Sequence, residues 1–166
     1  IVRWLLSGCF LIFLMVVVGG VTRLTHSGLS MVDWHLFMGV IPPLSDAEWQ
    51  QTFNLYKQYP EYQKVNFNYT LNEFKKIFFW EYLHRMMGRM LGLVFIIPFV
   101  FFLIRKSLSK KLILQSLLLL LLGALQGAIG WWMVKSGLVD KPDVSHYRLA
   151  VHLTMAFLTC GYTLWV

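Results

Sequence analysis

Residues 112–134 read LILQSLLLLLLGALQGAIGWWMV, an uninterrupted run of 23 residues without a charged side chain. A helix of about 20 apolar residues crosses the ~30 Å hydrocarbon layer of a bilayer, so this stretch predicts a membrane-spanning helix. Residues 4–22 and 149–166 are two further charge-free runs, of 19 and 18 residues. Residues 90–104 give only 15 uncharged residues and reach spanning length when the helix is extended backwards to about residue 77. The sequence therefore predicts four membrane-spanning helices.

The composition agrees with a membrane protein and sets its topology. Of the 166 residues, 57% are hydrophobic and 14% are charged, and a soluble domain of this composition would be prone to aggregate. The net charge of +7 does not indicate nucleic-acid binding, because the basic residues Arg105, Lys106, Lys110 and Lys111 crowd one short loop. By the positive-inside rule this loop and the N-terminus are expected on the cytoplasmic side of the membrane.

The predicted fold class is an all-α membrane protein, an up-down bundle of four transmembrane helices with a partly helical extracytoplasmic loop. Residues 1–166 are expected to form one unit with transmembrane helices at about 3–23, 77–104, 112–134 and 147–166, outer loops at 24–76 and 135–146, and an inner loop at 105–111. Ile1 is not a start residue and Val166 ends a predicted span, so both termini are expected to be cut points in a longer protein.

Two capping boxes predict helix starts in and after the long outer loop. Ser45 with Glu48 predicts a short helix that runs to about Lys57. Thr70 with Glu73 predicts that the second membrane helix begins outside the bilayer and enters it as one continuous rod.

Two histidines fall at similar predicted depth near the outer face of the membrane. Counting ~20 residues back from Arg105 places His84 at the outer hydrocarbon boundary, and His152 lies about one turn inside it. The second and fourth spans run in the same direction, so the two side chains can face each other across one gap. Two neutral imidazoles from facing helices can ligate heme iron from both sides.

Polar and small residues surround this histidine pair on the predicted helices. Glu81, His84, Arg85 and Gly88 share one stripe of the second span. Arginines nearer the water can pair with heme propionates, because a guanidinium binds a carboxylate through two matched hydrogen bonds. The candidate cofactor-binding residues are Arg85, Arg148, Arg89, Gly88 and Gln126.

Each of these residues also has a structural interpretation. A single histidine near a helix end is more often an interfacial residue than a metal ligand. Glu81 and Arg85, four residues apart, are equally consistent with a helix-stabilising ion pair, and glycines often serve helix packing alone. His26, His35 and His146 are expected to be loop or surface residues rather than ligands.

Taken together, the motifs resemble the heme A synthase family. They are residues 19–25 (GGVTRLT), 27–30 (SGLS), 81–85 (EYLHR), 126–137 (QGAIGWWMVKSG) and 147–153 (YRLAVHL), and the resemblance covers essentially the whole chain. It implies an eight-span enzyme of two similar four-helix halves, of which this chain is the N-terminal half and the second is absent. The family oxidises the C8 methyl group of heme O to the formyl group of heme A for cytochrome c oxidase, with heme b held mainly in the other half.

By this resemblance, His84 and His152 would be the axial ligands of the substrate heme iron, and Glu81 would be the catalytic acid-base or charge-stabilising group. The implied partners are heme O, heme A, the lipid bilayer, heme O synthase and a ferredoxin-type electron donor, with a second copy of the chain as a further candidate and no nucleic acid. A bacterial inner membrane is the expected location, with the mitochondrial inner membrane as the alternative. The rival interpretation is a b-type electron carrier with the same bis-histidine heme, and a third is an assembly subunit without chemistry.

The cysteines set this chain apart from some members of the family. Some bacterial members carry a cysteine pair in the first outer loop, whereas residues 24–76 contain none. The chain therefore resembles the cysteine-free, mitochondrial-type branch, and no thiol-based step is expected. Cys9 and Cys160 both lie in apolar spans and predict neither a disulfide framework, nor a zinc site, nor covalently attached heme.

Overall fold

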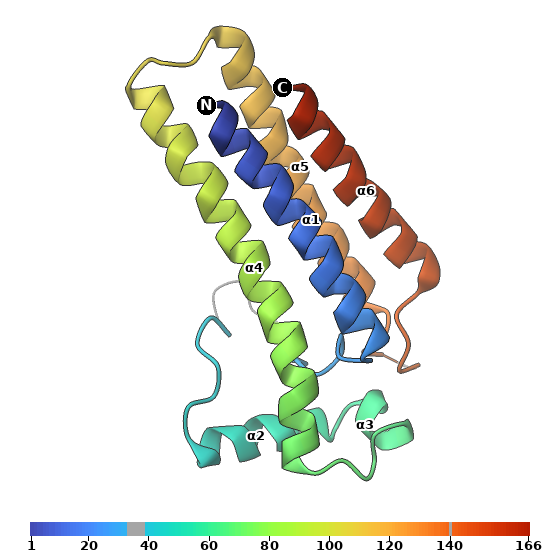
Figure 1. Ribbon diagram of the computed structural model, residues 1–166. Coiled ribbons are helices and arrows are strands. Elements are labelled where there is room, and N and C mark those ends of the chain that lie inside the picture. The colour runs from blue at the N-terminus through green and yellow to red at the C-terminus, as the bar shows by residue number, and fades with distance from the viewer. Residues whose placement is uncertain (33–38, 140) are drawn as a thin grey trace.

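The computed structural model describes residues 1–32, 39–139 and 141–166, and in these ranges the chain is helical and contains no strand. Figure 1 shows the helices, which are α1 (Val2–Leu24), α2 (Asp46–Tyr56), α3 (Pro60–Lys64), α4 (Leu71–Ile104), α5 (Lys110–Lys135) and α6 (His146–Trp165). The predicted all-α class is confirmed for the described residues.

Three of these helices, α1, α4 and α5, are long and apolar enough to cross a membrane. The helix that was predicted as a fourth span, α6, is not among those found in the described part of the chain. The polar side chains of His146, Arg148 and His152 in its first two turns lower its hydropathy. The described residues therefore hold three candidate membrane-spanning helices, and the fourth span stays a prediction.

The four long helices lie side by side, as Figure 1 shows, and α1 and α5 run in the opposite direction to α4 and α6. Helix α1 packs against α4 and α6, and α5 packs against the same two helices. Helices α4 and α6 therefore stand diagonally opposite each other, with α1 and α5 between them. This arrangement turns one face of α4 and one face of α6 toward the same interior.

Helices α2 and α3 lie beside the start of α4, at the end of the bundle where α1 ends (Figure 1). The predicted capping box at Ser45 is confirmed, and α2 stops at Tyr56 with Lys57 as its C-cap. The aromatic side chains of Phe53, Tyr56 and Phe74 are buried together between α2 and α4. Helix α3 was not predicted, because five residues are too few to show a helical period.

Helix α4 begins with the predicted capping box at Thr70 and continues without interruption to Ile104, although Pro98 lies inside it. A proline has no amide hydrogen, so the carbonyl oxygen of Val94, four residues earlier, lacks its usual helical donor. The indole nitrogen of Trp4 in α1 donates a hydrogen bond to this oxygen at 3.1 Å. Trp4 is buried beside Phe95 and Phe99, so α1 supplies both the missing donor and the packing that holds it.

Candidate functional site

The first predicted ligand, His84, lies on α4 with its ring against α1. Its Nε2 atom lies 3.1 Å from the position that a Cβ atom on Gly19 would occupy. Any larger residue at position 19 would therefore press on the imidazole, since carbon atoms in contact normally stay 3.5–4.0 Å apart. The absence of a side chain at Gly19 leaves room beside α1 for the Nε2 end of the His84 ring.

The second predicted ligand, His152, lies on α6 with its ring against α5. A Cβ atom on Gly130 would lie 3.0 Å from its Cε1 atom. The Nδ1 atom of His152 is buried and has no hydrogen-bond partner among the described residues. Gln126, one turn before Gly130 on α5, donates from Nε2 to the main-chain oxygen of His152 at 2.9 Å and so ties α5 to this turn of α6.

The structure brings the two histidines into one interior between the diagonal helices α4 and α6. Their imidazoles are close enough to interact electrostatically. The described ranges hold no group of three or more His, Cys, Asp or Glu side chains that could bind a bare metal ion. Heme iron needs at most two ligands from the protein, because the porphyrin supplies the others, and a pair of neutral imidazoles matches that need. The donor set therefore fits heme better than it fits an isolated ion.

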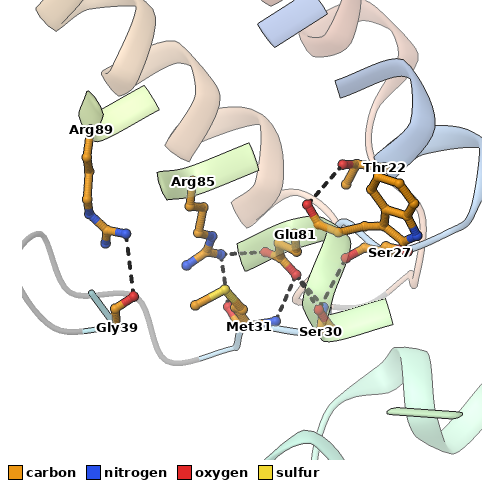
Figure 2. Close-up of polar contacts among 9 residues, drawn as sticks. Thr22, Ser27, Ser30, Met31, Gly39, Glu81, Arg85 and Arg89 are labelled. Carbon is orange, nitrogen blue, oxygen red and sulfur yellow. Dashed lines mark hydrogen bonds and ion pairs between the residues drawn. The ribbon is translucent and has the colours of Figure 1, made fainter. Parts of the chain in front are cut away.

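Glu81, one turn before His84, joins α4 to the loop that follows α1 (Figure 2). One carboxylate oxygen, Oε2, accepts hydrogen bonds from the amide of Ser30 at 2.7 Å, the hydroxyl of Ser30 at 2.7 Å and the amide of Met31 at 2.8 Å. The other, Oε1, accepts from Nη2 of Arg85 at 2.6 Å, and this nitrogen also donates to the main-chain oxygen of Met31 at 3.0 Å. Glu81 is 3% exposed, so this network is buried.

The predicted ion pair between Glu81 and Arg85 is present. The three hydrogen bonds that Glu81 accepts from the loop after α1 were not predicted. Ser30 and Met31 were not predicted to contact Glu81. The sequence signal that could have indicated this contact is the SGLS motif at residues 27–30. Its serines directly follow an apolar helix, and such polar groups need hydrogen-bond partners when they are buried.

The other predicted cofactor-binding residues lie in three different surroundings. Arg89 reaches the main-chain oxygen of Gly39 at 3.5 Å (Figure 2). Arg148 donates to the main-chain oxygen of Trp132 at 2.7 Å and lies over the indole ring of that residue. A Cβ atom on Gly88 would lie 3.6 Å from Cε of Met15, so Gly88 faces α1. Binding of propionates by Arg85, Arg89 and Arg148 stays a prediction.

The sequence profile of the COX15-CtaA family, described as cytochrome oxidase assembly protein, matches residues 2–166. The chain belongs to this family.

Curated relatives of this COX15-CtaA chain carry the name heme A synthase. The protein of Flavobacterium psychrophilum is 60% identical over 168 residues, which cover 100% of this chain and 50% of the relative. The protein of Flavobacterium johnsoniae is 58% identical, and the match covers 100% of this chain and 49% of the relative. The protein of Nitrosospira multiformis is 55% identical, and the match covers 98% of this chain and 46% of the relative. The chain thus spans about half the length of the curated relatives it matches. No solved structure matches the chain significantly.

Sequence reasoning missed a second buried polar cluster in the outer segment of this COX15-CtaA chain. The hydroxyl of Tyr56 donates to Oε2 of Glu61 at 3.0 Å, and the side-chain amide of Asn66 donates to the Tyr56 oxygen at 2.9 Å. All three side chains are buried. Burial raises the pKa of Glu61 from 4.5 to about 7, although the hydrogen bond from Tyr56 opposes the rise, and the negative charge of Glu81 adds to it. Glu61 therefore lies close enough to Glu81 for the two carboxyl groups to interact electrostatically.

Two of the three histidines that were not expected to be ligands lie in the described part of the chain. His26 and His146 are exposed, and His146 lies 3.8 Å from a carboxylate oxygen of Asp143. His35 lies outside the described residues.

Proposed function

We propose that this chain is a heme-binding half of a heme A synthase, a membrane oxidoreductase that converts the C8 methyl group of heme O to the formyl group of heme A for cytochrome c oxidase. The observation that carries the proposal is the pair His84 and His152, which two diagonal helices bring into one interior, each against a glycine. Membership of the COX15-CtaA family and the name of the curated relatives support the reaction.

The proposed topology has four spans in an up-down bundle, with α6 as the fourth. The loop with Arg105, Lys106, Lys110 and Lys111 faces the cytoplasm, and α2 and α3 belong to an extracytoplasmic cap. The bacterial origin of the relatives supports a bacterial inner membrane. Heme b in a second half, heme O synthase, a ferredoxin-type donor and a homo-oligomer remain predictions from the resemblance.

In this proposal, His84 and His152 would hold the iron, and Arg148, with Arg85 and Arg89, would anchor the propionates. When bound, heme iron supplies one-electron and oxygen chemistry. The protein chain contributes the orientation of the histidine side chains. Gln126 fixes the turn of α6 that bears His152, and Gly88 lets Met15 of α1 approach α4 one turn after His84.

Glu81 has two proposed roles. Its four hydrogen bonds support a structural role, in which it holds the loop at Ser30 and Met31 against α4. Its place one helical turn from His84 supports a role as acid-base or charge-stabilising group in the oxidation. A thiol-based step is not part of the proposal, since residues 24–76 contain no cysteine.

The second candidate function is electron transfer by a bis-histidine b-type heme. The observation in its favour is the matched pair of imidazoles, because iron ligated on both faces has no open position for oxygen. Substitution of Glu81 separates the two functions. Under the enzymatic proposal, the Glu81→Gln variant binds heme but makes no heme A, whereas normal heme A production by this variant would refute a catalytic role for Glu81.

The test of the heme site is the reduced-minus-oxidised absorption spectrum, with extracted-heme analysis, of the complete purified protein. The expected result for His84→Ala and His152→Ala is loss of a low-spin heme signal and of heme A. The matched control is His146→Ala, which removes an exposed imidazole from the same helix as His152 and should retain both. Full heme content and full product in both ligand variants would place the chemistry outside this half.

A further inference from the structure

Two helical glycines provide the surfaces on which the histidine rings rest. A methyl group on Gly19 would lie 3.1 Å from Nε2 of His84, and one on Gly130 would lie 3.0 Å from Cε1 of His152. Both distances are shorter than ordinary van der Waals contact, so the ring or the helix would have to move by a few tenths of an ångström. At the neighbouring Gly20 and Gly127, a Cβ atom would meet nothing within 4 Å in the described part of the chain.

The two glycines hold equivalent places in two helix pairs. Helix α1 packs on α4, and α5 packs on α6, with the histidine on the later helix of each pair. Gly19 lies five residues before Leu24, the last residue of α1, and Gly130 lies five residues before Lys135, the last residue of α5. A glycine beside a histidine ring, five residues from the end of the neighbouring helix, thus occurs twice, once for each imidazole. Random placement of helix-packing glycines does not predict this repetition.

A hydrogen bond commonly fixes the orientation of a ligating histidine through its second ring nitrogen. His152 has no such bond at Nδ1 among the described residues, although that atom is buried. A Cβ atom on Gly130 would lie 3.6 Å from both ring nitrogens, so the surface of α5 at this glycine lies beside the edge of the ring that carries them. The closeness of α5, rather than a hydrogen bond at Nδ1, therefore limits how far this ring can turn.

We propose that Gly19 and Gly130 are positioning residues that set the ring orientations of His84 and His152 at the heme iron. The inference rests on the proposed function, since it needs heme between these histidines. A methyl group at either glycine turns or displaces one ring, and the ligand field at the iron changes with it. A glycine that only allowed close helix packing would leave the ligand field unchanged.

The test compares Gly19→Ala and Gly130→Ala with Gly20→Ala and Gly127→Ala in the complete protein. All four replacements raise helix propensity by up to about 1 kcal/mol, so the two controls account for this effect. The measurements are the electron paramagnetic resonance g values of the oxidised low-spin heme, its midpoint potential and the ratio of heme to protein. The expected result is shifted g values and potential, or partial loss of heme, in the first pair and wild-type values in the second.

Identical g values, potential and heme content in all four variants would overturn the proposal. If Gly19→Ala fails to accumulate, the double variant Gly19→Ala/His84→Ala should accumulate like His84→Ala alone, because removal of the ring removes the clash. No recovery in the double variant would show that the clash is elsewhere. The His84→Ala and His152→Ala variants, measured alongside, separate the two proposals. Retained heme in them overturns the heme site and this inference together, whereas lost heme with unchanged spectra in the glycine variants overturns this inference alone.

Discussion

The Glu81→Ala substitution removes one acceptor group that serves four hydrogen bonds. The amides of Ser30 and Met31 lose their partner, whereas the Ser30 hydroxyl can still donate to the main-chain oxygen of Ser27 at 3.2 Å. Arg85 keeps its bond to the main-chain oxygen of Met31 but loses its counter-ion. The loop after α1 then keeps one hydrogen bond from Arg85, together with the packing of Met31 and Val32 in the core that they share with Ile77 and Phe78 of α4.

The magnitude follows from the burial of these groups. Each buried amide left without an acceptor costs about 1–3 kcal/mol, and removal of one partner from a buried ion pair costs about 3–5 kcal/mol. These terms overlap, and the side chain of Arg85 is 14% exposed, so water can partly replace the lost carboxylate. The expected loss is about 3–5 kcal/mol in the free energy of unfolding. Arg85→Ala should cost less, because Glu81 then keeps its three bonds to the loop.

The assay is denaturant unfolding of the complete protein in detergent, with limited proteolysis of the outer segment as a local readout. Glu73→Ala is the matched control, because it removes a carboxylate from the first turn of the same helix and should cost only a helix cap, about 1 kcal/mol. The Glu81→Ala/Arg85→Ala double variant should lose less than the sum of the single variants, as expected for contacting residues. A Glu81→Ala protein as stable as wild type, with the loop equally resistant to protease, would refute the structural role.

Three further predictions concern parts of the chain outside the heme site. Because the pKa of Glu61 is raised from 4.5 to about 7 in the folded chain, the folded state holds this proton more tightly than the unfolded chain does. The stability that results is complete below about pH 4.5 and is lost as pH rises through about 7, a fall of about 3 kcal/mol. Unfolding free energies measured across this range should fall in the wild type, whereas Glu61→Gln should lack this component; parallel profiles would contradict the raised pKa. Trp4→Phe should lower the free energy of unfolding by about 1 kcal/mol, because the main-chain oxygen of Val94 loses its hydrogen-bond donor. The loss should be smaller in a Pro98→Ala background, where the amide of residue 98 can donate to that oxygen. Equal losses in the two backgrounds, measured as a double-mutant cycle of unfolding, would show that Trp4 acts through packing alone. Ser45→Ala should lower the free energy of unfolding by about 1 kcal/mol and speed amide hydrogen exchange in the first turn of α2. Unchanged exchange there would mean that the capping box does not stabilise the start of this helix.

The long helices and their starts could be predicted from the sequence because they depend on local features. Charge-free runs of spanning length predicted α1 and α5 closely, and the capping boxes at Ser45 and Thr70 predicted the first residues of α2 and α4. The short helix α3 escaped prediction, since its five residues are arranged by the buried contacts of Glu61 rather than by periodicity.

The sequence by itself also determined the candidate functional residues of the interior. Ionisable side chains in apolar helices are rare, so His84, His152, Glu81 and the arginines stood out from composition and spacing alone. Helical periodicity placed several of them on one stripe of α4, but it could not say which would point inward and which would reach the outer loop.

Only the tertiary structure decided what each of these side chains contacts. Glu81 turns to a loop 50 residues away in sequence, and each histidine ring rests on a glycine of a different helix. A glycine carries no side chain that could signal such a partner, and a loop amide has no sequence signature at all. These contacts arise because the packing of α1 on α4 and of α5 on α6 brings the groups together, and that packing depends on the shapes of whole helices rather than on any short motif.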